Sequence, residues 1–370
     1  MVNRPNPPDN WRKTIIIEPP RRSHRTIGGS QEDKLKDTMK PGNQSEIRKC
    51  ILPSHPAFYL TTLLLAAGLP ALAEDAQSST NAATADTTTA KPADKGDPLP
   101  LHQIEGSGGI FSTLSAYIVN PPRNNELIGR PAVGFAFVDL GHDVDLEAIT
   151  VTESPLKRLE LGYGWNHLSL GNLPSALGSG YHGPDAVQLH NFNARFQLIT
   201  ENEFDQPWLP ALTAGVHYKY NDDISDIDKA VGGALTSHGI SGDNGADFTL
   251  YASKLVTQLP RPVLFEIGGR ATRAVWDGLG GFTSGYNFVA EGNVVVFVTS
   301  NFALAAEYKE QPDDYRPIGS LVRSESDWWT LDAAYIVNKH LTLALGYGHF
   351  GNVLNNKADG VWGLTTKWEF

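Results

Sequence analysis

The stretch HLTLALGYGH, residues 340–349, carries the pattern that decides the fold of this chain. Its odd-numbered positions from 341 to 347 are Leu, Leu, Leu and Tyr, and the even-numbered positions between them are Thr, Ala and Gly. Successive side chains of a β-strand point to opposite faces. The stretch therefore predicts a strand with one apolar face and one face of small and polar residues.

The same alternation recurs from Ile110 to the C-terminus, in stretches separated by turn residues. With 340–349, we predict thirteen strands, the others over 110–119, 132–140, 145–152, 158–166, 186–200, 208–220, 246–258, 262–276, 285–298, 301–310, 327–337 and 359–370. A strand of about 9 to 11 residues crosses a bilayer, where a sheet must close on itself to leave no unpaired edge. The sequence therefore predicts an all-β fold, a single antiparallel transmembrane β-barrel of about 12 to 14 strands.

The second face of the predicted strands is polar and charged. Where Leu159 and Leu161 point to lipid, Glu160 between them points inward. Aromatic residues gather near the strand ends, where such barrels carry interfacial girdles. By the same parity, the residues predicted to line the lumen are Arg195, Lys219, Glu266, Arg270, Glu291, Glu307 and Asp332, with His217 and Lys309 beside them. Both signs of charge are present, which predicts a lumen whose charges neutralise one another.

The connections between strands alternate in length, with short links such as 259–261 and longer ones such as 221–245. Bacterial barrels have short periplasmic turns and longer external loops, so the alternation predicts a periplasmic C-terminus. An odd number of strands does not return the chain to the side on which it starts. Either 99–105 adds a strand, giving 14, or 110–119 folds inside the barrel, giving 12, and the sequence leaves both possibilities open.

A leader is indicated ahead of the barrel. Arg48 and Lys49 give a basic start, an apolar run follows, and the small residues Ala71 and Ala73 complete an export signal, so we predict Sec-type export with cleavage near Ala73. The predicted organisation is an upstream extension that precedes the true start (1–38), a signal peptide (39–73), a disordered periplasmic tether (74–98) and the barrel (99–370). A real cytoplasmic-side extension is the alternative interpretation of the first segment.

The composition of the exported part limits its partners. Residues 74–370 carry a formal charge of about −16, which argues against a nucleic-acid partner. The sole cysteine, Cys50, lies in the leader, so the mature chain is expected to use neither disulfides nor a thiolate. The expected partners are outer-membrane lipid and, in a channel, a small solute.

The last ten residues, VWGLTTKWEF, place Trp362, Leu364, Trp368 and Phe370 on one face and end on the aromatic residue. This pattern resembles the terminal signature of outer-membrane proteins that the barrel assembly machinery recognises. We therefore predict these four residues as an assembly signal and the assembly machinery as a partner. The expected location is the bacterial outer membrane.

Five segments carry a further signal: EGSGG at 105–109, DFTLYASKL at 247–255, RATRA at 270–274, LAAEYKEQPDD at 304–314 and NKHLTLALGYGHFGN at 338–352. Together they resemble an uncharacterised family of Gram-negative outer-membrane β-barrel proteins known only as a domain of unknown function. The resemblance covers nearly the whole domain from about Gln103. It implies a barrel fold but no reaction, so no catalytic residue is carried over.

No catalytic or metal-binding pattern in the sequence has a diagnostic spacing, so we predict no catalytic residue, no cofactor and no metal. His142, Asp143 and Asp145 fit a polar hairpin turn better than a metal site. The nearest arrangement to a hydrolase is a set of loop residues, Ser169, Ser175, Ser179, His167 and His182. Nucleophilic catalysis needs a base within hydrogen-bond reach of the hydroxyl, which spacing alone does not establish.

The leading functional hypothesis is therefore a passive channel for small solutes, not an enzyme. The first alternative is a structural or surface-binding barrel whose lumen is plugged by ion pairs. The second is a lipid-modifying enzyme of the outer leaflet. Barrels of 12 to 14 strands lie between those that side chains fill and those that leave wide aqueous channels, so size does not decide between these hypotheses.

Overall fold

The structure is a computed structural model that describes residues 101–123, 126–314, 323–353 and 356–370. The predicted upstream extension, signal peptide and tether lie outside the described residues. The described domain begins at Leu101.

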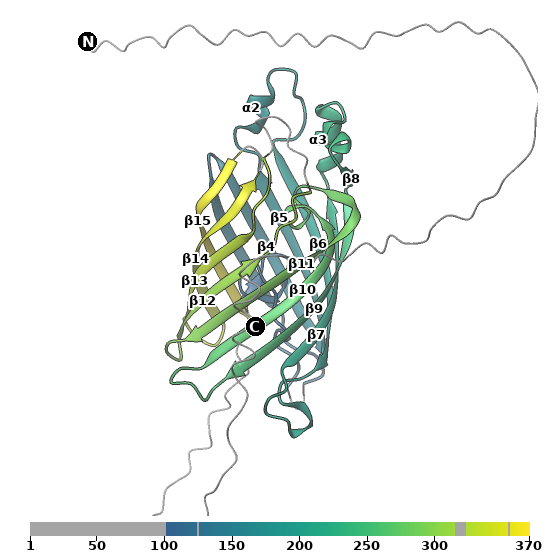
Figure 1. Ribbon diagram of the computed structural model, residues 1–370. Coiled ribbons are helices and arrows are strands. Elements are labelled where there is room, and N and C mark those ends of the chain that lie inside the picture. The colour runs from purple at the N-terminus through teal and green to yellow at the C-terminus, as the bar shows by residue number, and fades with distance from the viewer. Residues whose placement is uncertain (1–100, 124–125, 315–322, 354–355) are drawn as a thin grey trace, which may run out of the picture. The chain divides into compact units, whose positions relative to one another are not determined.

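Twelve long strands form the wall of the barrel (Figure 1). They are β3 (Ala132–Gly141), β4 (Val144–Leu156), β5 (Leu159–Ser169), β6 (Ala186–Ile199), β7 (Ala211–Asn221), β9 (Asn244–Val256), β10 (Val263–Ala274), β11 (Phe282–Phe297), β12 (Phe302–Lys309), β13 (Trp328–Ile336), β14 (Leu341–Val353) and β15 (Asn356–Glu369). Each wall strand pairs antiparallel with its neighbours in the sequence, and β15 pairs with β3 to close the circle. The predicted closed antiparallel barrel is confirmed.

The strand number resolves to twelve, because residues 110–119 do not belong to the wall. They follow a small hairpin of β1 (Leu101–Gln103) and β2 (Ser107–Gly109), which is a separate two-stranded sheet. Of the two possibilities that the sequence left open, folding of 110–119 inside the barrel is confirmed. The inclusion of 110–119 among the membrane-crossing strands is wrong, and so is a further wall strand over the described part of 99–105. We call residues 101–119 the inner segment, since it lies inside the barrel and its residues are buried except for half-buried Leu101.

The wall strands have the alternating faces that the sequence predicts. In β5 and β6, Leu161 and Phe192 are exposed on the outer face, whereas Glu160 and Arg195 are buried on the inner face. The outer face therefore offers apolar side chains to lipid, and the strands satisfy one another's backbone groups. The four predicted assembly residues Trp362, Leu364, Trp368 and Phe370 are all exposed at the C-terminal end of the wall.

The two ends of the barrel differ. One end, the loop end, carries the long connections with α2 (Leu173–Leu177), α3 (Ile224–Ala230), α4 (Ala234–Ser237), η2 (Trp276–Gly278) and the short strand β8 (Ile240–Gly242), and Figure 1 shows α2 and α3 at that end. The other end, the turn end, carries η1 (Glu203–Asp205) and the C-terminus. The usual asymmetry of bacterial barrels predicts an external loop end and a periplasmic turn end. None of the helices in the described part of the chain is long and apolar enough to cross a membrane.

Candidate functional site

The inner segment rests directly on the backbone of β5. A Cβ atom added to Gly162 would lie 1.9 Å from the carbonyl oxygen of Gly106, and one added to Gly164 would lie 2.6 Å from that of Glu105. No side chain fits at these two positions while the segment is in place. The glycines of β5 therefore form a groove in the inner wall that seats the hairpin of the inner segment.

Glu105, at the tip of that hairpin, is the centre of a buried cluster of charges. One oxygen of its carboxylate lies 2.5 Å from Lys219 Nζ and 2.6 Å from Arg270 Nη1. Asp247 on β9 bridges the same two cations, at 2.8 Å from Lys219 and 3.0 Å from Arg270. Charges from three wall strands thus converge on one carboxylate that belongs to the inner segment.

The cluster continues towards the loop end. Arg270 Nε lies 2.7 Å from Glu291, and Lys309 Nζ lies 2.5 Å from Asp277 in the η2 turn. All these side chains are buried, so each charge depends on its partners rather than on water. The cluster joins the inner segment, the wall and the η2 turn at the loop end.

A second contact holds the middle of the inner segment. Glu160 on β5 accepts hydrogen bonds from the backbone amides of Gly108 at 3.2 Å and Val119 at 2.8 Å. Arg195 lies 2.9 Å from the Glu160 carboxylate and donates to the Gly108 carbonyl at 2.9 Å. The Arg195–Glu160 ion pair of the wall therefore supplies a hydrogen-bond donor and an acceptor to the backbone of the inner segment.

A third contact lies on the opposite part of the wall. The Glu307 carboxylate accepts hydrogen bonds from the amides of Phe111 at 3.2 Å, Ser112 at 3.0 Å and Thr113 at 2.8 Å. Three successive amides on one carboxylate form a charge-assisted anchor for the turn of the inner segment. The Thr330 hydroxyl lies 2.8 Å from a carboxylate oxygen of Glu307 and 2.8 Å from one of Asp332, and it thereby connects Asp332 to this anchor.

The structure places all seven residues predicted to line the lumen on the inner face of the wall. It brings Lys219, Arg270 and Glu291 into one cluster, pairs Arg195 with Glu160, and joins Glu307 to Asp332. Glu266 stands apart from these groups and accepts hydrogen bonds from the hydroxyls of Ser115 and Ser253. None of the seven is open to solvent in the structure, since all are buried.

Parity placed Glu160 on the inner face, but sequence reasoning missed three other charged members of the site. Asp247 lies on wall strand β9, and the parity argument would have found it. Glu105 and Asp277 lie in turns, where no alternation indicates direction. Their roles depend on the inner segment and the η2 turn folding back into the barrel.

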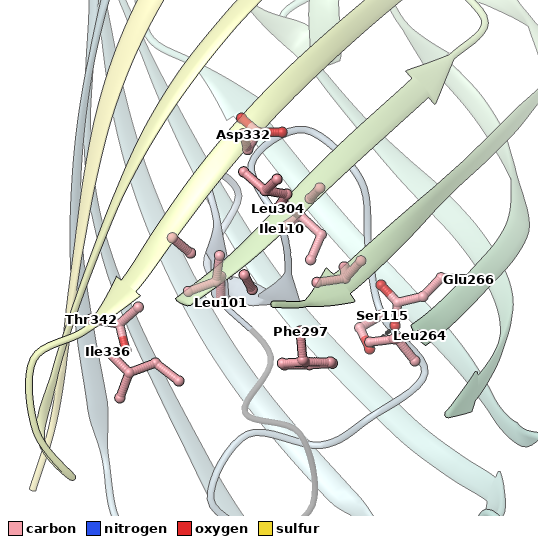
Figure 2. A pocket seen from close by; sticks show the side chains of 14 residues that line it. Leu101, Ile110, Ser115, Leu264, Glu266, Phe297, Leu304, Asp332, Ile336 and Thr342 are labelled. Atoms are coloured by element: carbon pink, nitrogen blue, oxygen red, sulfur yellow. Dashed lines mark hydrogen bonds between the residues drawn. The ribbon is translucent and has the colours of Figure 1, made fainter. Parts of the chain in front are cut away.

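Little space remains in the lumen. A cavity of about 40 Å³ lies near the turn end. Figure 2 shows side chains that line it, Leu101 and Ile110 from the inner segment and Phe297 and Ile336 from the wall. Its lining is mainly apolar, with Ser115 hydrogen-bonded to Glu266 at one side. A volume of this size holds no more than a few water molecules. The described conformation is therefore occluded.

The loop residues considered for hydrolysis are not assembled into a site. The Ser169 hydroxyl donates to the carbonyl of Asp143 at 2.9 Å, and the ring of His167 stacks on Trp165. Within the residues that the structure describes, no group of three or more His, Cys, Asp or Glu side chains is arranged to hold a metal ion.

A buried carboxyl at the loop end gives a pH prediction. Burial raises the pKa of Glu325 to about 8, and the Trp276 indole donates a hydrogen bond to its carboxyl group. A pKa that is higher in the folded loop means that protonation stabilises the fold, so this stabilisation declines as the pH rises from about 5 through about 8. We expect trypsin to cleave after exposed Arg323 faster at pH 9 than at pH 6.

The control for that prediction is Glu325→Gln, which keeps a hydrogen-bond acceptor without a titrating proton. Cleavage rates, corrected with a peptide substrate for the pH dependence of trypsin, should not vary with pH in this variant. An equal pH dependence in the two proteins would contradict the assignment.

The fold defines the class of protein: a closed antiparallel barrel with an apolar outer face and a polar interior is an outer-membrane β-barrel. Residues 100–367 match the family model described as protein of unknown function (DUF3034), and the chain belongs to that family. A comparison with curated proteins finds no match.

Several solved barrels are similar in outline. The KdgM porin shares 8% identity, covering 65% of this chain and 99% of that one with a TM-score of 0.38. The Acinetobacter baumannii outer membrane protein Omp33 shares 12%, covering 66% and 99% with a TM-score of 0.36. Outer membrane phospholipase A from Escherichia coli shares 11%, covering 65% and 95% with a TM-score of 0.32. At these identities and scores, no residue role is carried over from any of them.

Proposed function

We propose that the protein is a channel for small solutes in the outer membrane and that the inner segment closes it. The observation that carries the proposal is the chemistry of the contact between wall and segment. Glu160, Glu307 and the Glu105 cluster hold the segment through hydrogen bonds and ion pairs. When the segment moves, water molecules can replace these polar contacts one by one. Water cannot replace the contacts of an apolar core in this way.

The energetic balance also supports a removable segment. Buried ion pairs stabilise a fold no more, and often less, than well-packed apolar residues of the same volume would. A barrel that only needed filling would therefore do as well with leucines and valines on its inner face. When the segment leaves, Lys219, Arg195 and Glu307 would face a water-filled path with charges of both signs.

The alternative is a permanently plugged structural or surface-binding barrel. The observation in its favour is the occlusion itself, with a lumenal cavity of about 40 Å³. The two functions differ in whether the inner segment moves, and a tether can test this.

A disulfide between the segment and the wall makes the test. A Cβ atom at Gly134 would lie 3.1 Å from the Cβ of His102, a little below the spacing of about 3.5–4.5 Å found in disulfides. It would also lie 2.5 Å from Thr150 Oγ1, so all variants carry Thr150→Ala to remove this clash. We would measure planar-bilayer conductance of the refolded mature protein carrying His102→Cys and Gly134→Cys in the Thr150→Ala background. The channel hypothesis predicts openings under reducing conditions and silence after oxidation, with each single-cysteine variant unaffected by oxidation.

Silence of the folded double variant under both conditions, together with a silent wild type, would reject the channel and favour the plugged barrel. Conductance that persists after complete oxidation would show that solute passes without movement of the tethered hairpin. Disulfide formation is checked by mass spectrometry and folding by heat-dependent migration on gels.

We also propose that the terminal strand is the contact for the barrel assembly machinery. Deleting Phe370, which is 57% exposed just after β15, is expected to lower the amount of folded protein in outer membranes severalfold. The measurement is the fraction with heat-dependent gel migration. Phe204→Ser is the control, because Phe204 is also an exposed aromatic residue at the turn end but lies far from β15 in the chain. Equal folded amounts for the deletion and the wild type would exclude Phe370 from the signal.

A further inference from the structure

Three side chains at the loop end form a continuous hydrogen-bonded chain. Ser326 Oγ lies 2.9 Å from His349 Nε2, and His349 Nδ1 contacts Asp359 Oδ1. Ser326 lies just before β13, His349 lies on β14 and Asp359 on β15, so three adjacent strands bring together residues that are apart in the sequence.

The order of groups in this chain matches that of a serine hydrolase. With His349 protonated on Nδ1, it donates to Asp359, and its free Nε2 accepts the proton of Ser326. Trp329 stacks on the His349 ring at 6.3 Å with an interplanar angle of 16°, and Lys357 forms an ion pair with the second oxygen of Asp359. The imidazole is thus oriented from two sides, while Ser326 at the loop end is close enough to the surface to meet a substrate.

The position of the chain indicates the substrate. Trp329, Tyr347 and Trp362 form a cluster of exposed aromatic rings on the outer face, with Tyr347 at 6.2 Å from Trp329 and 4.8 Å from Trp362. Such clusters lie at the interface of the membrane with water. His349 follows Tyr347 on the same face of β14, one step further towards the loop end.

We propose that Ser326, His349 and Asp359 form an esterase site for acyl esters of outer-leaflet lipids. Ser326 and His349 are the catalytic residues, and Asp359 is a positioning residue. This site lies outside the barrel, so the activity is independent of the proposed channel.

The proposed reaction balances with water as co-reactant. Ser326 Oγ forms a bond to the ester carbonyl carbon as His349 Nε2 takes its proton, and the carbon–oxygen bond of the ester breaks as that proton passes to the leaving alcohol. Water then attacks the acyl-serine, gives its proton to His349 and releases the fatty acid, after which Ser326 regains a proton.

The barrel contains a matched control. His190 on the loop-end half of the wall lies 3.1 Å from Asp222 and 2.8 Å from the Tyr163 hydroxyl, so it is also held between a carboxylate and a hydroxyl. In that chain the hydroxyl is a phenol rather than a serine. His190→Ala therefore disturbs a similar hydrogen-bonded chain without touching the proposed nucleophile.

The first test is covalent labelling of the full-length protein, assembled in outer membranes and purified in detergent, with a fluorophosphonate probe. Labelling forms a bond from Ser326 Oγ to phosphorus and releases fluoride. Ser324, an exposed serine two residues before Ser326, provides a second control. We expect the wild type, Ser324→Ala and His190→Ala to label at similar rates. Ser326→Ala and His349→Ala should label at least about 100-fold more slowly. Absence of labelling in folded wild type, or wild-type labelling of Ser326→Ala, would overturn the proposal.

The second test measures fatty acid release from vesicles of phosphatidylethanolamine and phosphatidylglycerol. Release by the wild type that Ser326→Ala abolishes is expected, and no release by the folded wild type would exclude these lipid esters as substrates. Asp359→Asn should lower kcat at least about tenfold and leave KM unchanged, because Asp359 does not touch the substrate. An equal change in both constants would assign Asp359 a structural role only. Heat-dependent gel migration confirms folding of every variant.

Discussion

Substituting alanine at Gly162 is expected to expel the inner segment and turn an occluded barrel into an open pore. The new methyl group would lie 1.9 Å from the carbonyl oxygen of Gly106, a contact that no rotamer can relieve because the Cβ atom is fixed by the backbone. The wall itself loses no hydrogen bond by the change. Planar-bilayer recordings should change from predominantly closed for the wild type to predominantly open for Gly162→Ala.

Gly285→Ala is the matched control, because a Cβ atom at that position of β11 would have no neighbour within 4 Å. It should conduct like the wild type. A second readout is proteolysis, since the expelled inner segment becomes accessible while the wall stays resistant. A Gly162→Ala barrel that is folded, silent and protease-resistant would show that the segment shifts along the lumen instead of leaving it.

Reversing the charge of Arg270 should have the largest effect on stability. Arg270 lies 2.6 Å from Glu105, 3.0 Å from Asp247 and 2.7 Å from Glu291, so Arg270→Glu would place another carboxylate among buried acids. Removing one partner of a buried ion pair alone costs about 3–5 kcal/mol, and like-charge repulsion adds to it. The expected result is failure to fold, or folding with the inner segment displaced, measured by urea unfolding and protease accessibility.

Arg273→Glu provides the control on the same strand. Arg273 lies three residues further along β10 on the opposite face, where its guanidinium stands 5.9 Å from the ring centre of Tyr286. A change of about 1 kcal/mol or less is expected there. Equal unfolding midpoints for the two reversals would contradict the role given to the Glu105 cluster.

The wall could be predicted from sequence because membrane strands obey one simple rule. Each wall strand must be apolar on the lipid side and long enough to span the membrane beside its neighbours. Alternation and length therefore identify a wall strand in the sequence, as in β14. Residues 110–119 satisfy the same alternation for another reason. Their serines and threonines meet polar groups of the lumen while their apolar side chains pack inside, so both faces are buried. A period of two alone does not separate a wall strand from an extended segment inside the barrel.

The lumenal charge cluster and the proposed esterase site differ in how far they could be predicted from the sequence. Parity placed the charged wall residues on the inner face, but it said nothing about Glu105, because the tip of a hairpin has no strand phase. Ser326, His349 and Asp359 have no diagnostic spacing. Only the pairing of β13 with β14 and of β14 with β15 brings them into contact, and that pairing is a property of the register.

The closure between β3 and β15 also determines how the inner segment is attached to the wall. The inner segment precedes every wall strand in the chain, whereas the strand that completes the wall is the last to be made. The inner segment is therefore covalently attached to the wall only through the chain that leads into β3, at one side of the closing seam, and its departure from the lumen would unpair no wall strand.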